Sequence, residues 1–210
     1  MARFSDQQIR RYSRQILLRE VGGQGQSRLG AARPVLFCQG EVGALAAEYL
    51  WRAGVIAPTL FLPTAEEAER FTSRLLATGY PGAPAQAISE AAPELQRLAA
   101  GAPGYTWLQL SGGDVVAPVP AQDSAATSLL WACCRGGWGV VGQGAEALQR
   151  TFSDPLAVAS PATETGAGAM VIASALALLA VQRIVGISPE LSAQPVWQLD
   201  LTSNVLPLWW

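Results

Sequence analysis

The stretch from Pro34 to Val55 constrains the fold of this chain more than any other. It opens with an apolar run, Val35 to Cys38, which predicts a buried strand. Gly40 and Gly43 follow at once, and small and apolar residues then recur at helical spacing until Gly54. A strand, a glycine turn and a helix in this order open a nucleotide-binding βαβ unit, in which backbone amides at the helix N-terminus face a phosphate.

The turn departs from the dinucleotide-binding pattern G-x-G-x-x-G. Cys38 replaces the first glycine of the pattern, and Gly40 and Gly43 supply the other two. Glu41 stands where a phosphate would approach, and its carboxylate suits a helix N-terminus but would repel a polyphosphate. Two interpretations follow: the two glycines are a vestigial nucleotide-binding turn, or they serve only the tight turn and close packing of the helix.

Composition excludes several kinds of chemistry. The chain contains no histidine and no lysine, so all 14 of its basic residues are arginine. It therefore has no histidine base or histidine metal ligand, no Schiff-base lysine and no P-loop lysine. The three cysteines, Cys38, Cys133 and Cys134, include no C-x-x-C spacing, which argues against a zinc site or a disulfide framework. We expect no metal site, and we expect these thiols to lie in the core.

Length and charge indicate a single globular domain without a polyanionic partner. With 210 residues, half of them hydrophobic and 14% charged, the chain can bury a substantial core. Its net charge of −2 gives no electrostatic basis for binding nucleic acid or an anionic membrane. Free thiols and a polar N-terminus without a visible signal peptide favour the cytoplasm. The uncharged segment Gly166 to Val181 is shorter than the roughly 20 residues of a membrane span, so we expect a wholly buried helix.

Strands and helices are predicted to alternate along the chain, which indicates an α/β fold with an open sheet. Ser5 and Gln8 form a capping box at the start of the first helix, and the glycines from Gly22 to Gly25 predict a flexible break. The predicted strands after the first are Thr59 to Leu62, Ala85 to Ile88, Tyr105 to Leu110, Trp138 to Val141, and a terminal hairpin of Val196 to Leu201 and Val205 to Leu208. Helices are also predicted outside the first βαβ unit. They begin at Ser5, Gln26, Thr64, Ser89, Gln122, and Thr165 or Gly166, and the last two run to Arg135 and Gly186.

Two ends of the sequence carry a family resemblance. The N-terminal string Arg11-Tyr12-Ser13-Arg14-Gln15, the glycine helix and the late helix from Gly166 to Gly186 resemble the ThiF/MoeB/HesA family, the bacterial relatives of ubiquitin-activating enzymes. The resemblance covers roughly half of the chain. It implies a Rossmann-like open sheet, mostly parallel, with helices on both faces and an antiparallel C-terminal hairpin. We accordingly divide the chain into a helical arm, residues 1–33, and a ThiF-type domain, residues 34–210.

Members of that family adenylate the C-terminal glycine of a small ubiquitin-like or sulfur-carrier protein, using ATP and magnesium. The resemblance also implies dimerisation, as a homodimer or with a ThiF-like partner. It implies that an arginine, here Arg14, reaches the nucleotide bound by the partner subunit.

The family's chemical residues are largely missing here. The family's strand after the glycine helix ends with a carboxylate that holds the ribose, but here that strand runs Leu62-Pro63-Thr64. The phosphate-binding lysine has no counterpart, and Gln109 stands where the metal-binding aspartate is expected. Asp114 could be a displaced ligand. An arginine could replace the lysine, and the candidates are Arg52, Arg70 and Arg74.

Three functions therefore remain open. The first is a non-catalytic relative that binds no cofactor and acts as a dimeric binding or regulatory subunit. In this function Arg14 reaches the nucleotide of a partner subunit, or Arg11 and Arg14 only form salt bridges that fix the first helix. The second is an active adenylyltransferase with relocated residues. The third is an NAD- or FAD-binding Rossmann protein, which lacks the expected acidic residue on the ribose. The terminal pair Trp209-Trp210 either packs on the sheet edge or anchors a partner.

Overall fold

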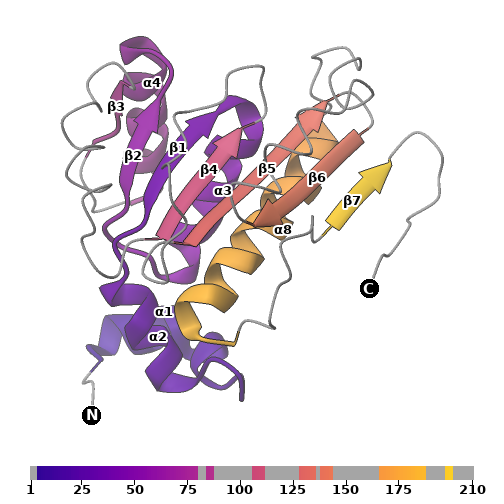
Figure 1. Cartoon of the computed structure of the whole chain (residues 1–210). Helices are drawn as coiled ribbons and strands as arrows, with labels where there is room; N and C mark the ends of the chain where they lie inside the picture. Colours follow the sequence, from indigo (N-terminus) through magenta and orange to yellow (C-terminus); the bar gives the residue numbers. More distant parts are fainter. Residues whose placement is uncertain are drawn as a thin grey trace.

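A computed structural model describes residues 4–79, 84–87, 106–111, 128–135, 138–143, 166–187 and 197–200 of the chain. In these ranges the chain forms one seven-stranded sheet with the order β3-β2-β1-β4-β5-β6-β7 (Figure 1). Strands β3, β2, β1, β4 and β5 run parallel, and β6 and β7 join by antiparallel pairing. The strands are β1 (Val35–Gln39), β2 (Thr59–Leu62), β3 (Gln86–Ala87), β4 (Thr106–Ser111), β5 (Ser128–Arg135), β6 (Trp138–Gln143) and β7 (Trp197–Asp200).

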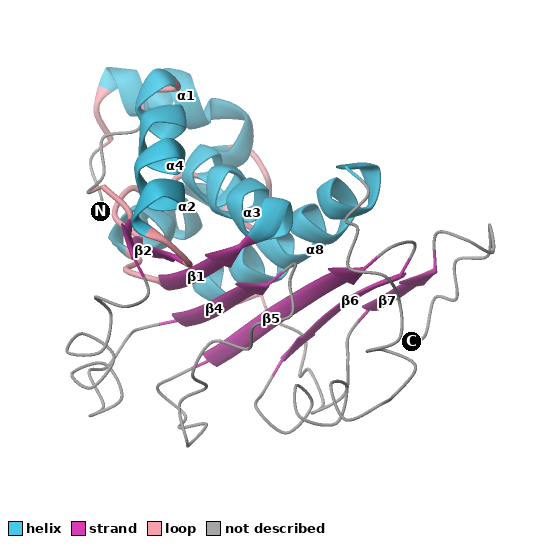
Figure 2. Cartoon of the chain, turned by 90° about the horizontal axis from the view of Figure 1, so that it is seen from above, coloured by secondary structure: helices cyan, strands magenta, loops and turns pink. Residues whose placement is uncertain are grey.

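The described helices that follow β1 in the chain cover one face of this sheet, and the two that precede it lie beyond the amino ends of the parallel strands (Figures 1 and 2). The helix predicted from Ser89, and residues 205–208 of the predicted hairpin, lie outside the described residues. The first strand of that hairpin contains β7, which pairs antiparallel with β6, a partner that the sequence did not predict. The helices are α1 (Asp6–Ile16), α2 (Gly22–Ala31), α3 (Gly40–Ala53), α4 (Ala65–Ala77) and α8 (Gly166–Val185).

The central strand β1 is buried on both faces, as its uninterrupted apolar run predicts. Leu36 and Cys38 pack into the core formed with α3 and α8. Phe37 points to the opposite face, where its ring stacks on that of Phe61 with centroids 5.3 Å apart. Side chains alternate across a strand. The register that pairs Phe37 with Phe61 therefore also directs Leu36 and Cys38 to the helix-covered face of the sheet.

The prediction of a helix from Gln122 to Arg135 is wrong for the described part, because Ser128–Arg135 is strand β5. This strand lies inside the sheet between β4 and β6. Trp131 and Cys133 are buried on one face and Ala132 on the other. A short apolar run that is buried on both sides has no alternating pattern, so periodicity alone cannot separate it from a buried helix.

Helix α8 is a core helix, but the prediction that it is wholly buried is wrong. Ile172, Ala173 and Leu176 are buried in the core, whereas Met170 and Leu178 are about half exposed on the opposite side. By length and composition alone this helix could cross a membrane. It packs along α3 and against β5 and β6, as Figures 1 and 2 also show.

The glycines predicted as a flexible break belong to the first turn of α2. Gly25 is required there for close packing, because a Cβ atom at this position would lie 2.7 Å from Cγ1 of Val185 in α8. The guanidinium of Arg28 also donates to the carbonyl of Val185. Helix α2 is thereby held against the C-terminal end of α8.

Helix α1 is held against the C-terminal end of α3. Its N-terminus has the predicted capping box, in which Ser5 and Gln8 bond each other's backbone amide. Tyr12 is buried, and the guanidinium of Arg11 lies 4.5 Å from the ring centre of Trp51. Helices α1 and α2 thus form an arm below the amino ends of the parallel strands (Figure 1).

Candidate functional site

The turn between β1 and α3 has the geometry of a glycine turn. Gly40 is the first residue of α3 and has φ of +60°, a conformation that glycine adopts without the steric penalty of a side chain. Gly43 is buried one turn further along the helix. The structure therefore places both predicted glycines at the carboxyl end of the central strand, where parallel α/β sheets bind ligands.

Glu41 places a negative charge in this turn. It lies in the first turn of α3, and a Cβ atom built on Gly166 would be 3.9 Å from its Oε2 atom. Gly166 is the first residue of α8, so the carboxylate lies near the N-termini of two helices. Backbone amides at a helix N-terminus favour a negative charge, and in this chain a side chain supplies that charge.

A pocket of about 330 Å³ opens beside the turn. The helix α3, the end of β2 and the helix α4 form its walls. Its apolar wall includes Leu62 and Phe71, and its charged groups are two carboxylates and two guanidiniums. The lining residues are Cys38, Gly40, Glu41, Ala44, Leu62, Pro63, Glu67, Arg70, Phe71 and Arg74.

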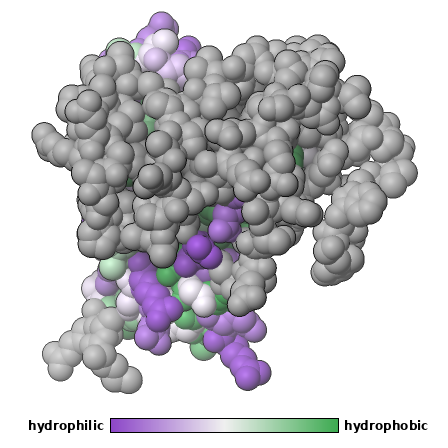
Figure 3. Space-filling model, viewed as in Figure 1, coloured by the Kyte–Doolittle hydropathy of each residue, from purple (hydrophilic) through white to green (hydrophobic). Residues whose placement is uncertain are grey.

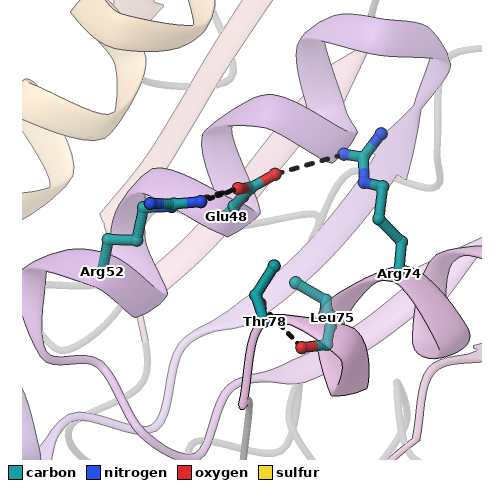
Figure 4. Close-up of polar contacts among 5 residues, drawn as sticks. All are labelled: Glu48, Arg52, Arg74, Leu75 and Thr78. Carbon is teal, nitrogen blue, oxygen red and sulfur yellow. Dashed lines mark hydrogen bonds and ion pairs between the residues drawn. The ribbon is translucent and has the colours of Figure 1, made fainter.

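The structure separates the three arginines that could replace a lysine. Arg52 does not line the pocket, and it pairs with Glu48 on its own helix at 2.6 Å. Arg74 lies 3.6 Å from the other carboxylate oxygen of Glu48 (Figure 4). It also lines the pocket and packs over the ring of Phe71. Arg70 also lines it, with Glu66 at 4.0 Å on an exposed surface. Of these three candidates, Arg70 and Arg74 are therefore the ones within reach of a ligand in the pocket.

Glu67, in the first turn of α4, also lines the pocket. Thr64 accepts a hydrogen bond from the backbone amide of Glu67, and its hydroxyl donates to the Glu67 carboxylate at 3.1 Å. This N-cap turns α4 back over the end of β2 and so brings the carboxylate to the pocket. The one sequence signal for its approach to the pocket is its position five residues after the end of β2.

The described residues contain no group of three or more cysteine, aspartate or glutamate side chains that could hold a metal ion. Asp114, the candidate displaced ligand, lies outside the described residues. Gln109 lies in β4, next to Phe37 of β1 in the register of the sheet.

Arg14 lies far from this pocket. It is in the last turn of α1, at the amino end of the parallel strands, whereas the pocket lies at their carboxyl end (Figure 1). Within the described ranges neither Arg11 nor Arg14 forms an ion pair, so the interpretation that salt bridges fix the first helix is wrong there. Arg11 stacks on Trp51 instead, and Arg14 is exposed.

Burial raises the pKa of the Cys38 thiol far above its ordinary value. The thiol of the unfolded chain ionises above about pH 8.5, while the folded chain keeps it protonated. Its contribution to stability is therefore present below that pH and is lost as the pH rises further. We expect the free energy of unfolding to fall more steeply between pH 8 and pH 10 in the wild type than in Cys38→Ala, by up to about 1.4 kcal/mol per pH unit. Urea unfolding at the two pH values measures this change. An equal loss of unfolding free energy in the wild type and in Cys38→Ala would contradict the prediction.

Part of the sequence is similar to that of known proteins. No protein-family model matches the chain. A stretch of 54 residues is 50% identical to adenylyltransferase and sulfurtransferase MOCS3 of Bos taurus, and covers 26% of this chain and 12% of that protein. A stretch of 55 residues is 46% identical to molybdopterin-synthase adenylyltransferase of Salmonella typhimurium, and covers 26% of this chain and 22% of that protein. The matched stretches thus span less than a quarter of either relative.

Solved structures resemble the chain over nearly its whole length. PaaA shares 15% identity, with a TM-score of 0.69 over 97% of this chain and 82% of that one. MccB of E. coli shares 15% identity, with a TM-score of 0.56 over 94% of this chain and 71% of that one. MccB has also been solved with ATP and with MccA. At this identity the likeness shows a common fold, so the predicted Rossmann-like fold is confirmed.

Proposed function

We infer that this chain, which is related to the ThiF/MoeB adenylyltransferases, is a non-catalytic relative that acts as a dimeric binding or regulatory subunit. The observation that carries this proposal is the carboxylate of Glu41, held in the turn where a polyphosphate would bind. Glu67 adds a second negative charge to the same pocket. Two carboxylates repel a ligand that carries several negative charges and so weaken its binding.

The sequence lacks residues that adenylation needs, and this supports the same proposal. Transfer of an adenylyl group requires cations and a metal placed where phosphate charge develops. The chain has no lysine, and the strand that should end in a ribose-binding carboxylate ends at Leu62 and is followed by Pro63 and Thr64. Losing one stabilising group typically lowers the rate by about 10²–10³, so the combined loss leaves little activity.

The proposed partner is a second copy of the chain or an active ThiF-like protein, and the protein bound would be ubiquitin-like or a sulfur carrier. Arg14 supports a role at such a contact, because it is exposed and forms no ion pair within the described ranges. It lies at the opposite end of the molecule from its own pocket (Figure 1), so it could act on a nucleotide only in a partner subunit. We propose a cytoplasmic location on the ground of the free thiols.

A second candidate function is an active adenylyltransferase that uses ATP and magnesium. Arg70 and Arg74 favour it, because both line the pocket and arginine binds phosphate well. Arg74 is paired with Glu48 of α3 (Figure 4). In this function the two arginines would take the place of the missing lysine.

Calorimetric titration with magnesium-ATP separates the two functions. We expect no saturable binding to the wild type at millimolar ATP. Glu41→Gln with Glu67→Gln should strengthen binding by about tenfold or more, since removing like charges near a phosphate is worth at least ~1.4 kcal/mol at an effective dielectric constant of ~20. The matched control is Glu20→Gln with Glu69→Gln, which also removes two negative charges, but from exposed residues that neither line this pocket nor pair with its arginines.

Two outcomes would decide against the non-catalytic proposal. The first is micromolar binding of ATP to the wild type that Arg70→Ala with Arg74→Ala abolishes, which supports the active enzyme. The second is an affinity that the two pairs of glutamine substitutions change equally, because the carboxylates of the pocket would then have no specific effect.

A further inference from the structure

The pocket beside the glycine turn combines charges of both signs with an apolar wall. Its described charged groups are two carboxylates and two guanidiniums, so their formal charges sum to zero. They belong to Glu41, Glu67, Arg70 and Arg74. The carboxylates repel a polyanion, and the guanidiniums repel a simple cation. A ligand that carries one charge of each sign is therefore complementary to this pocket.

Three of the four charged residues follow one another along α4. Glu67, Arg70 and Arg74 stand three and four positions apart and all line the pocket, as residues on one helix face do. Figure 3 shows hydrophilic side chains at the end of the molecule where Figure 1 places α4. An α-helix rises by about 1.5 Å per residue, so Glu67 and Arg70 are offset by about 4.5 Å along the axis. Two opposite charges on neighbouring atoms of a small ligand can meet both residues at once.

The carboxylate of Glu67 is held in position without being neutralised. The Thr64 hydroxyl donates to its Oε2 atom at 3.1 Å, and the backbone amide of Glu67 donates to that hydroxyl at 3.2 Å. Within the described part of the chain Glu67 forms no ion pair, and its Oε1 atom accepts no hydrogen bond. This half-buried carboxylate can therefore accept a hydrogen bond from a cationic group in the pocket.

The two arginines of the pocket differ in how they are held. Arg70 lies 4.0 Å from Glu66, and the two side chains are 69% and 80% exposed, so this pair is weak. Arg74 lies 3.6 Å from Glu48 of α3 (Figure 4) and packs over the ring of Phe71. Arg70 is thus available to bind a carboxylate, and Arg74 adds a fixed positive charge to the same wall.

The remaining wall of the pocket is apolar. Leu62 at the end of β2, Pro63 after it and Phe71 of α4 all contribute to it. The volume of about 330 Å³ lies at the lower end of the roughly 300–1,000 Å³ that is usual for small-molecule pockets. The pocket therefore suits a ligand smaller than a nucleoside triphosphate, with an apolar part that the wall removes from water.

We propose that this pocket binds a free α-amino acid with a large apolar side chain. Glu67 binds its ammonium group, Arg70 binds its carboxylate, and its side chain lies against Leu62 and Phe71. An α-amino acid carries both charged groups on one carbon atom, whereas each terminus of a peptide carries only one of them. The inference rests on the proposed function, because an adenylating enzyme would use the same arginines for phosphate.

Calorimetric titration tests this inference with four probes: L-phenylalanine, N-acetyl-L-phenylalanine, L-phenylalaninamide and L-alanine. We expect L-phenylalanine to bind the wild type saturably at millimolar concentration or below. The other three lack the ammonium group, the carboxylate and the large side chain, respectively. Each should bind at least about tenfold more weakly, since each loses a charge-assisted hydrogen bond or an apolar contact.

Two variants identify which group of the ligand meets which residue. Glu67→Gln keeps an acceptor for the Thr64 hydroxyl and should weaken L-phenylalanine about tenfold, but should leave N-acetyl-L-phenylalanine unchanged. Arg70→Gln should weaken L-phenylalanine similarly and leave L-phenylalaninamide unchanged. The matched controls are Glu69→Gln and Arg19→Gln, at exposed residues that do not line the pocket, and they should change no affinity. Circular dichroism melting verifies that each variant folds.

The inference is overturned if L-phenylalanine does not bind, if any of the other three probes binds as tightly, or if the controls weaken binding as much as the pocket variants. A parallel titration with magnesium-ATP separates this failure from failure of the proposed function. If neither L-phenylalanine nor ATP binds, only the inference fails. If ATP binds at micromolar concentration and Arg70→Ala with Arg74→Ala abolishes that binding, the proposed function fails and the inference fails with it.

Discussion

Replacing Trp51 with alanine is expected to lower the free energy of unfolding by about 3–5 kcal/mol, the usual effect of truncating a large buried aromatic side chain. Trp51 is 3% exposed and belongs to the core formed by α3, α8 and the sheet. Its ring also carries the guanidinium of Arg11. The substitution therefore removes core volume and the stacking surface of the arm at once, and urea unfolding measures the loss.

A double-mutant cycle separates the two contributions. Arg11→Ala should destabilise the wild type by about 0.5–1 kcal/mol, the range of an exposed cation–π contact, and should have almost no effect in the Trp51→Ala protein. Trp51→Phe should keep most of the core contribution. Equal effects of Arg11→Ala in both backgrounds would show that the stacking contributes nothing to the attachment of α1.

Gly54→Ala is expected to lower the free energy of unfolding by about 2–6 kcal/mol. Gly54 has φ of +117°, where an L-residue is strained by roughly 1–3 kcal/mol. A Cβ atom there would lie 2.2 Å from Nε2 of Gln26, which donates to the carbonyl of Ala53 at 3.0 Å. Displacing this buried amide leaves polar groups unsatisfied, at about 1–3 kcal/mol more.

Gly79→Ala is the matched control for backbone strain. Gly79 has φ of +81°, and no heavy atom lies within 4 Å of the position its Cβ would take. Its substitution should cost only about 1–2 kcal/mol, the strain of a left-handed residue. If the two variants lose equal stability, the contact between Gly54 and Gln26 has no energetic role. Hydrogen exchange should further show that only Gly54→Ala loosens the amides of α2.

Both predictions concern the junction at which α1 and α2 meet the C-terminal ends of α3 and α8. The contacts of this junction attach α1 and α2 to the main body of the chain.

The sequence predicted those parts of the fold that local patterns encode. The strand, turn and helix from Val35 to Gly54 were predictable because an apolar run, two glycines and a helical repeat are contiguous. The caps at Ser5 and Thr64 were predictable for the same reason. Strand β5 was not, because its side chains are buried on both faces of the sheet and leave no alternation.

The candidate site could be predicted only in part. Gly40, Glu41 and Gly43 lie next to one another in sequence, so the charge in the turn was visible at once. The approach of Glu67 and Arg74 to the same pocket results from the way α4 folds back over β2, and sequence spacing does not reveal it. The stacking of Arg11 on Trp51 joins residues 40 positions apart, so it too required the tertiary structure.

The most direct test of the account is an NMR titration of the wild-type protein with magnesium-ATP, following the amide signals of Gly40, Glu41 and Gly43. The account predicts that these signals do not move at millimolar ATP, because the Glu41 carboxylate opposes a phosphate in the turn. Saturable shifts of the three signals at micromolar ATP would contradict it, since they would show that the turn still binds nucleotide.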